Sequence, residues 1–196
     1  WLILYLFGAS PIVSKNFIHN NDYDFKKGKN CYYLPYATSL RMSNLGYQNV
    51  EQSQLNISLN ELNQYIDNLK IATETNHPAF ESISNIHGSI PSQINSNILQ
   101  IEDEYYASSR PKSSIVSDER MVTKISNHGI DYLELRSLDL NPFSGIGIEI
   151  QDLYFLESFL IYCGLFPSPL MTTEEEKQCR QNNLLVAIKG RSPDLN

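Results

Sequence analysis

Residues 131–138 read Asp-Tyr-Leu-Glu-Leu-Arg-Ser-Leu and carry the clearest strand pattern of the chain. Side chains of a β-strand point alternately to its two faces. One face therefore carries Leu133, Leu135 and Ser137, and the other carries Tyr132, Glu134, Arg136 and Leu138. Asn141-Pro142 follows the segment and ends the strand. The alternation predicts a strand that presents a carboxylate and a guanidinium on the same side.

Three segments elsewhere have the pattern of helices. The first begins at Ser58, where Ser58-x-x-Glu61 forms a capping box and apolar residues then recur at helical spacing up to residue 69. The second is predicted over about residues 151–166. The third follows Pro169, opens on Thr172-x-x-Glu175 or Thr173-x-x-Glu176, and closes near Gly190.

The remaining pattern favours an α+β fold. A second, less regular strand is expected at residues 94–101, and strands and helices do not alternate with glycine-rich turns as they do in α/β folds. Two polar stretches, residues 15–29 and 71–91, are expected to form surface loops. Because the sequence contains no repeat and no linker, it predicts part of a single domain over residues 1–196, without an internal boundary.

The composition limits the classes of function. The chain has 196 residues, with 15 Lys and Arg against 22 Asp and Glu, a net charge of −7, and it is 41% hydrophobic. Such a chain folds, and its excess of acid argues against binding to nucleic acid or to anionic membranes. No apolar run reaches the ~18 residues that a membrane span needs. Three widely spaced cysteines without a Cys-x-x-Cys pair indicate neither a disulfide framework nor a zinc site, and they favour the cytoplasm.

Glu134 and Arg136 lie about 6.7 Å apart on one face of the predicted strand. Both can serve one phosphate group if a divalent cation stands beside the carboxylate, because such a cation prefers oxygen ligands and a guanidinium donates two hydrogen bonds to phosphate. The pair therefore suits phosphoryl transfer. Taken alone, the same spacing is also typical of a surface ion pair.

Several longer stretches resemble the proteobacterial type of glutamate-cysteine ligase. Two of them are residues 132–143, Tyr-Leu-Glu-Leu-Arg-Ser-Leu-Asp-Leu-Asn-Pro-Phe, and residues 33–47, Tyr-Leu-Pro-Tyr-Ala-Thr-Ser-Leu-Arg-Met-Ser-Asn-Leu-Gly-Tyr. Further similar blocks are residues 5–11, residues 93–102 leading into Tyr105-Tyr106 and Arg110-Pro-Lys112, and the helix around residues 155–163. The blocks occur in order, so the resemblance covers essentially the whole chain.

The resemblance implies an enzyme that joins the γ-carboxylate of L-glutamate to L-cysteine, the first step of glutathione biosynthesis. In this family ATP phosphorylates the carboxylate, the cysteine amine attacks the γ-glutamyl phosphate, and Mg²⁺ assists both steps. The implied fold is similar to the catalytic domain of glutamine synthetase, with a curved, largely antiparallel sheet and helices packed outside it. Family members are much longer, so we expect an internal fragment in which this domain is incomplete and which is inactive when isolated.

The resemblance also implies roles for five residues. Glu134 matches a metal ligand, and Arg136 matches the catalytic arginine that contacts the transferring phosphate of the nucleotide. Arg41 matches an arginine at the substrate end of the site, Tyr47 matches an aromatic residue that helps to receive cysteine, and Tyr106 is placed in the same pocket. Arg41 and Tyr47 flank a Ser-Asn-Leu-Gly turn, a type of segment that can move over a ligand.

Alternatives stay open at this point. A catalytically silent relative would keep the fold and bind nucleotide or a partner, and a carboxylate-amine ligase for another amine would differ in the shape of its pocket. Arg110 and Lys112 could approach nucleotide phosphates, but a solvated loop is the favoured interpretation. The four histidines lie in polar contexts without ligand spacing and are expected at the surface.

Overall fold

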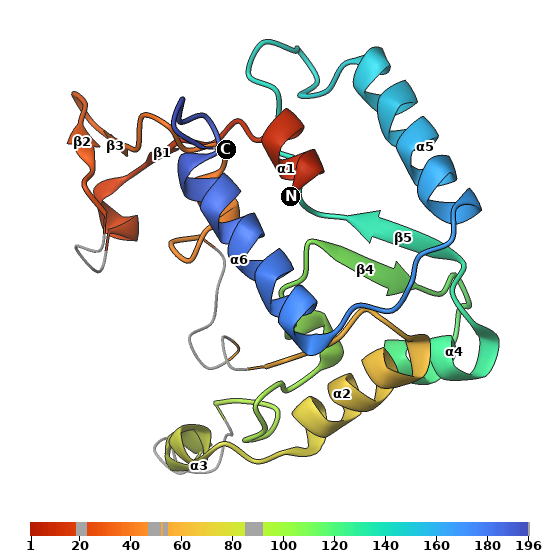
Figure 1. Ribbon diagram of the computed structural model, residues 1–196. Coiled ribbons are helices and arrows are strands. Elements are labelled where there is room, and N and C mark those ends of the chain that lie inside the picture. Colours follow the sequence, from red (N-terminus) through yellow and green to blue (C-terminus); the bar gives the residue numbers. More distant parts are fainter. Residues whose placement is uncertain (19–22, 47–51, 53–54, 85–91, 196) are drawn as a thin grey trace. The chain divides into compact units, whose positions relative to one another are not determined.

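The computed structural model describes residues 1–18, 23–46, 52, 55–84 and 92–195 (Figure 1). The chain forms two compact units. The first combines Trp1–Tyr47 with Ser137–Asn196, and the second is Gln48–Arg136. Each unit has a hydrophobic core of its own. None of the described helices is both long enough and apolar enough to cross a membrane.

The first unit contains helices and a small sheet. Its three short strands pair antiparallel in the order β1-β3-β2. Its core joins residues of the amino-terminal half to the last turns of α6, as Leu4 packs with Val186 and Ala187. Its elements are α1 (Leu2–Phe7), β1 (Ile12–Val13), the 3₁₀ helix η1 (Lys15–Phe17), β2 (Lys26–Lys27), β3 (Tyr32–Tyr33), the 3₁₀ helix η2 (Leu40–Met42), α5 (Ile150–Leu165) and α6 (Thr173–Lys189).

The carboxyl end of α6 anchors the segment that carries η2. The last carbonyls of a helix have no partner within the helix. Here Ala187 O accepts hydrogen bonds from the backbone N–H groups of Thr38 (3.0 Å) and Ser39 (3.1 Å), and Val186 O accepts one from the Thr38 hydroxyl (2.7 Å). Thr38 and Ser39 are fully buried. This anchor fixes the backbone just before Arg41.

Two glycines make room for this anchor. A Cβ atom on Gly8 would lie 2.8 Å from Cβ of Thr38, and one on Gly190 would lie 2.7 Å from Cγ2 of Thr38. Real Cβ atoms do not approach side chains this closely, so both positions require glycine for the backbone to come this near.

The predicted capping box of the last helix is confirmed at Thr172. Its hydroxyl accepts a hydrogen bond from the N–H of Glu175 (3.3 Å), and the Glu175 carboxylate accepts one from the N–H of Thr172 (2.7 Å). Both hydrogen bonds satisfy donors that the first turn of a helix leaves free. The negative charge also suits the positive end of the helix dipole.

Replacing Thr172 with Ala should lower the free energy of unfolding by about 1 kcal/mol, because it removes the cap and leaves the N–H of Glu175 without its acceptor. The measurement is chemical denaturation of a full-length protein that contains this sequence. Thr173→Ala is the matched control, because Thr173 lies one residue further on and is exposed, but caps nothing. Equal stability of the two variants would contradict the prediction.

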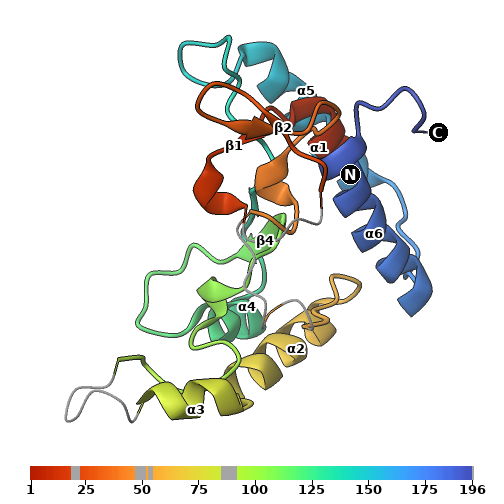
Figure 2. The same cartoon turned by 90° about the vertical axis from the view of Figure 1, so that its left-hand side faces the viewer.

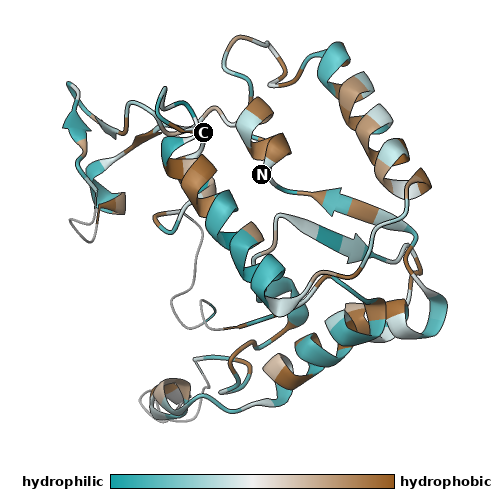
Figure 3. Cartoon of the chain, in the orientation of Figure 1, coloured by the Kyte–Doolittle hydropathy of each residue, from teal (hydrophilic) through white to brown (hydrophobic). Residues whose placement is uncertain are grey.

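Helix α5 matches the predicted helix at residues 151–166 almost exactly in its bounds. It opens on a capping box that pairs Glu149 with Asp152. Leu156 is buried, and hydrophobic residues recur along the helix (Figure 3). Cys163, which lies in an apolar run of this helix, is exposed.

The second unit contains three helices and a two-stranded antiparallel sheet, in which α4 lies in the connection between β4 and β5. Helices α2 and α4 lie side by side in both views (Figures 1 and 2). Gly129 ends α4 with a φ of 84°, a conformation that favours glycine, and the chain then enters β5. The elements are α2 (Leu62–Glu74), α3 (Pro78–Ser84), the 3₁₀ helix η4 (Glu102–Glu104), β4 (Ser109–Lys112), α4 (Met121–His128) and β5 (Tyr132–Leu135).

The first predicted helix starts later than Ser58, at Leu62. The Ser58 hydroxyl accepts a hydrogen bond from the N–H of Asn60 (3.2 Å), and the N–H of Ser58 donates to the side chain of Asn68 (3.1 Å). Serine can stabilise a turn by such local bonds as readily as it caps a helix. Ile66 and Leu69 are buried as their spacing predicts.

The strand expected at residues 94–101 is not formed. Asparagine and glutamine side chains replace a strand partner, since Asn97 donates to Thr73 O (2.5 Å) and Gln100 accepts from the N–H of Ile94 (2.7 Å). Leu99 is fully buried, and its N–H donates to Ala72 O (3.0 Å). The segment is therefore an irregular cover over the end of α2.

The loop expectation is wrong for much of residues 71–91. Helix α2 continues to Glu74, and α3 occupies Pro78–Ser84, while residues 85–91 lie outside the described part of the chain. Pro78 begins α3, because proline is well tolerated in the first turn of a helix. In the stretch 15–29, residues 19–22 lie outside the described part of the chain, and the described residues include η1 and β2 as well as irregular, mostly exposed chain.

Candidate functional site

Arg41 is held by a carboxylate of the first unit. It lies in η2, and its Nε donates to Oδ1 of Asp139 at 2.7 Å, while Nη2 donates to Leu138 O at 2.9 Å. The Arg41 side chain is 26% exposed and that of Asp139 is 4% exposed. The guanidinium is therefore held by Asp139 and Leu138 while the side chain stays partly exposed, which suits an anion-binding arginine.

Asp139 has a full set of hydrogen-bond partners. Besides Arg41, its Oδ2 accepts from the N–H of Ala9 and the hydroxyl of Ser10, both at 2.9 Å. Burial alone would raise the pKa of the Asp139 carboxyl, but the hydrogen bonds from Arg41, Ala9, Ser39 and Ser10 lower it below its ordinary value. Asp139 therefore stays charged and ties three segments of the first unit together.

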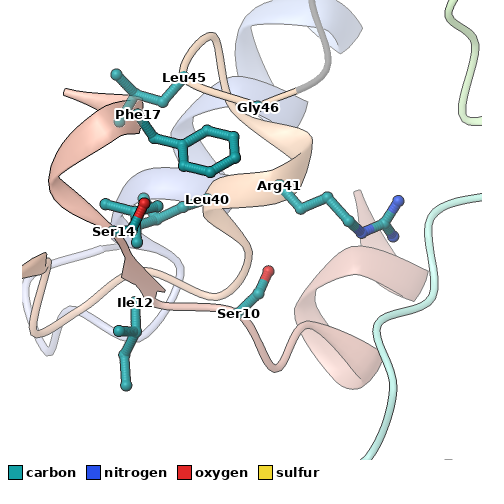
Figure 4. A pocket seen from close by; sticks show the side chains of 9 residues that line it. Ser10, Ile12, Ser14, Phe17, Leu40, Arg41, Leu45 and Gly46 are labelled. Carbon is teal, nitrogen blue, oxygen red and sulfur yellow. The ribbon is translucent and has the colours of Figure 1, made fainter. Parts of the chain in front are cut away.

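A small cavity of about 220 Å³ adjoins Arg41 in the first unit (Figure 4). The aliphatic stem of Arg41 borders it, and the guanidinium points away from Phe17 and Leu40 (Figure 4). Apolar side chains dominate the wall, which consists of Ser10, Ile12, Val13, Ser14, Phe17, Leu40, Arg41, Leu45 and Gly46. Tyr47 follows this wall in the sequence but lies outside the described residues.

Glu134 and Arg136 form an ion pair in the second unit. The distance from Arg136 Nε to Glu134 Oε1 is 3.0 Å, and the side chains are 31% and 36% exposed for Arg136 and Glu134. Strand β5 is confirmed over Tyr132–Leu135, and the N–H of Arg136 continues its pairing by donating to Ser108 O (2.8 Å). The shared face predicted from the alternation is therefore present.

Arg110 and Lys112 do not belong to a solvated loop. They lie in β4, where Arg110 stands opposite Glu134 and Lys112 opposite Tyr132 of the antiparallel strand β5. Directly opposed residues of an antiparallel pair share a face. Arg110 is only 4% exposed, and burial together with the charge of Arg136 lowers its pKa. The expectation failed because the strand pairing that buries the arginine involves residues more than 20 positions away.

Asp103 neutralises this basic pair. Its Oδ1 accepts hydrogen bonds from Lys112 Nζ (2.8 Å) and from Arg110 Nη1 (3.2 Å). The hydrogen bond from Lys112 holds the pKa of the Asp103 carboxyl below its ordinary value, against the effect of partial burial. The sequence reasoning missed Asp103, and its position in the Glu102–Glu104 acidic run gave no sign of these partners.

Tyr106 follows η4 at the surface of the second unit. Its side chain is 38% exposed, and its backbone N–H donates to Oε1 of Gln52 (3.3 Å). Tyr106, Glu134 and Arg136 belong to the second unit, whereas Arg41 belongs to the first. Of the described histidines, His128 is exposed and His77 is half-buried against Phe80.

The donor set limits what the described residues can offer a metal ion. Within residues 1–18, 23–46, 52, 55–84 and 92–195, no three His, Cys, Asp or Glu side chains come together as a metal site. Glu134 has the hard carboxylate oxygens and the partial exposure that a Mg²⁺ ligand needs. It therefore fits as one ligand of a magnesium ion, not as a complete site.

Comparisons with known proteins agree with these motifs. The sequence model of the glutamate-cysteine ligase family matches residues 1–186. The chain is 44% identical to the glutamate-cysteine ligase of Baumannia cicadellinicola and 42% identical to that of Pseudomonas putida. These alignments cover the whole chain but 38% and 37% of those relatives, so the chain spans less than two fifths of their length.

Two solved structures are also similar. A crystal structure of glutamate-cysteine ligase from Francisella tularensis in complex with AMP matches with a TM-score of 0.90 and 37% identity, over 100% of this chain and 39% of that one. A bifunctional glutathione synthetase from Pasteurella multocida matches with a TM-score of 0.56 and 23% identity, over 96% and 19%, which supports the fold alone. The mixture of helices with small antiparallel sheets, the motifs and the family match agree, and the chain belongs to the glutamate-cysteine ligase family.

Proposed function

We propose that this chain is the central part of an enzyme that joins the γ-carboxylate of L-glutamate to L-cysteine at the expense of ATP. The observation that carries the proposal is the ion pair between Glu134 on β5 and Arg136 just after it, within a chain that matches the ligase family over residues 1–186. The AMP bound to the similar Francisella tularensis ligase supports nucleotide binding. We place the enzyme in the cytoplasm, and infer that the described sheets belong to one glutamine synthetase-like catalytic domain.

The proposed reaction has two steps. The glutamate γ-carboxylate attacks the γ-phosphorus of ATP, and ADP leaves. The cysteine amine then attacks the carbonyl carbon of the γ-glutamyl phosphate, and inorganic phosphate leaves as the amine loses a proton. Both steps develop negative charge on phosphate oxygens, so both gain from a positioned cation.

The residues of this chain take distinct parts in these steps. Arg136 donates hydrogen bonds to the transferring phosphoryl group, with its side chain kept on the correct face by β5. Glu134 supplies one oxygen ligand to Mg²⁺, and the bound ion would neutralise phosphate charge. Arg41, fixed by Asp139, binds a carboxylate of the amino-acid substrates, and Tyr47 and Tyr106 receive cysteine.

The test uses a full-length protein that contains this sequence. Phosphate release is measured with ATP, Mg²⁺ and glutamate, in the presence and absence of cysteine. We expect release that depends on cysteine and is matched by γ-glutamylcysteine formation. Release that requires a different amine would indicate another carboxylate-amine ligase, and a folded, Mg²⁺-loaded protein without turnover would indicate a catalytically silent relative; either result would overturn the proposal.

A further inference from the structure

Arg110 is a buried cation whose side-chain bonds lead to the backbone. Nη2 donates to the carbonyl of Asp103 (2.6 Å) and to the carbonyl of Tyr105, and Nη1 donates to the Asp103 carboxylate (3.2 Å). A buried charge is costly unless it is paired and hydrogen-bonded. Nη1 and Nη2 of Arg110 find their partners in residues 103 and 105, whereas its buried Nε has no hydrogen-bond partner among the described residues. These residues come immediately before Tyr106.

The main chain of Arg110 is next to Glu134, the proposed Mg²⁺ ligand. Arg110 lies directly opposite Glu134 in the antiparallel β4–β5 pair. Arg110 therefore makes two links. Its backbone pairs with the strand that carries Glu134 and leads to Arg136. Its guanidinium binds the segment that carries Tyr106. The distance from Glu134 and Arg136 to Tyr106 therefore depends on Arg110.

A second side chain holds the same segment from another direction. Gln52 donates through Nε2 to the carbonyl of Glu104 (2.9 Å) and accepts through Oε1 from the N–H of Tyr106 (3.3 Å). Arg110 and Gln52 together bind the carbonyls of three consecutive residues and the N–H of Tyr106. The backbone at Tyr106 is thus determined by hydrogen bonds, while its side chain is left 38% exposed.

We propose that Arg110 is a positioning residue for Tyr106, and that it places this tyrosine for the amine substrate relative to Glu134 and Arg136. The inference rests on the proposed function and adds a residue to it. Only a guanidinium can serve two backbone carbonyls and a carboxylate from one planar group, because an ammonium is a compact point charge without this fork.

Arg110→Lys in the full-length enzyme is the direct test. The variant keeps the charge but loses the planar fork, so the KM for cysteine should rise by about 10-fold to 100-fold, since small displacements of a substrate-positioning group have effects of this size. The KM for ATP should not change, because Glu134 and Arg136 remain in register through the backbone. An unchanged KM for cysteine, or equal increases in both KM values, would overturn the proposal.

Lys112→Met is the matched control. Lys112 lies in the same strand and donates to the same Asp103 carboxylate, but not, among the described residues, to the carbonyls before Tyr106. The control should leave the KM for cysteine as in the wild type. An increase as large as that of Arg110→Lys would assign the effect to the Asp103 carboxylate, which both side chains bind, and would overturn the positioning role.

A measurement without turnover separates this proposal from the proposed function. A 3-fluorotyrosine placed at position 106 reports its surroundings by ¹⁹F NMR, whether or not the protein is a ligase. Its resonance should shift in Arg110→Lys and not in Lys112→Met, and no shift would overturn the proposal even if cysteine-dependent activity is present. If Arg110→Lys does not fold, Arg110→Gln replaces it, because an amide NH₂ cannot reproduce the fork that serves two carbonyls and a carboxylate, and an unchanged resonance in that variant would overturn the proposal.

Discussion

Replacing Arg136 with Ala should lower kcat by about 100-fold or more, because a donor that acts on charge developing in the transition state is lost. The side chain is 31% exposed and already lies 3.0 Å from Glu134, so a phosphoryl group can be reached without rearrangement of the strand. The measurement is steady-state phosphate release by a full-length ligase with saturating ATP, glutamate and cysteine.

Arg120→Ala is the control that separates a catalytic role of Arg136 from the loss of an ordinary ion pair. Arg120 makes a comparable ion pair in the same unit, with Nε 2.9 Å from Oε1 of Glu102, but it lies outside the proposed site. We expect it to retain the wild-type kcat. If Arg136→Ala also retained the wild-type kcat, the pair would be a surface ion pair and Arg136 would have no catalytic role.

Replacing Asp139 with Ala should cost about 3 kcal/mol of the free energy of unfolding, because it leaves a partly buried guanidinium and two other donors without their acceptor. The donors are Arg41 Nε, the N–H of Ala9 and the hydroxyl of Ser10. Urea denaturation of the full-length protein measures the loss. Asp24→Ala is the control, since Asp24 is an exposed carboxylate of the same unit, and equal losses for both variants would contradict the prediction.

The same carboxylate gives a defined dependence on pH. The folded pKa of Asp139 lies below the value of about 3.9 expected for the unfolded chain, so its proton is bound more tightly in the unfolded state. Its contribution to stability is therefore complete above about pH 4 and is lost as the pH falls through the folded pKa. The decrease in stability below pH 4 should be smaller in Asp139→Asn than in the wild type, and parallel curves would contradict this assignment.

The secondary structure that could be predicted was the part with local causes. The alternation at residues 131–138 depends on the two-residue period of a strand, and the cap at Thr172 depends on atoms within three residues. The cap is confirmed, and the strand is confirmed over Tyr132–Leu135, half of the predicted length. Ser58 shows the limit of this approach, because a helix cap and a local turn use the same hydroxyl, and the bond to Asn68 favours the turn.

The candidate site was only partly predictable for the same reason. Sequence motifs pointed to Glu134, Arg136, Arg41, Tyr47 and Tyr106, whose roles remain proposals, and the structure brings the first two into contact. The motifs did not indicate Asp139, although it stands within the quoted stretch of residues 132–143. Its partners Arg41 and Ala9 are 98 and 130 positions away, and no local pattern reveals such pairs.

The sequence by itself determined the family, because the order of the motifs is a property of the chain alone. It also determined the strand that carries Glu134 and leads to Arg136, and the face that the two residues share, because the strand period is local. Only the tertiary structure decided that Arg110 is buried, that its guanidinium holds the carbonyls before Tyr106, and that Asp139 fixes Arg41. These arrangements depend on which distant segments exclude water from a charged group. That is decided only when the hydrophobic cores form and bring those segments together.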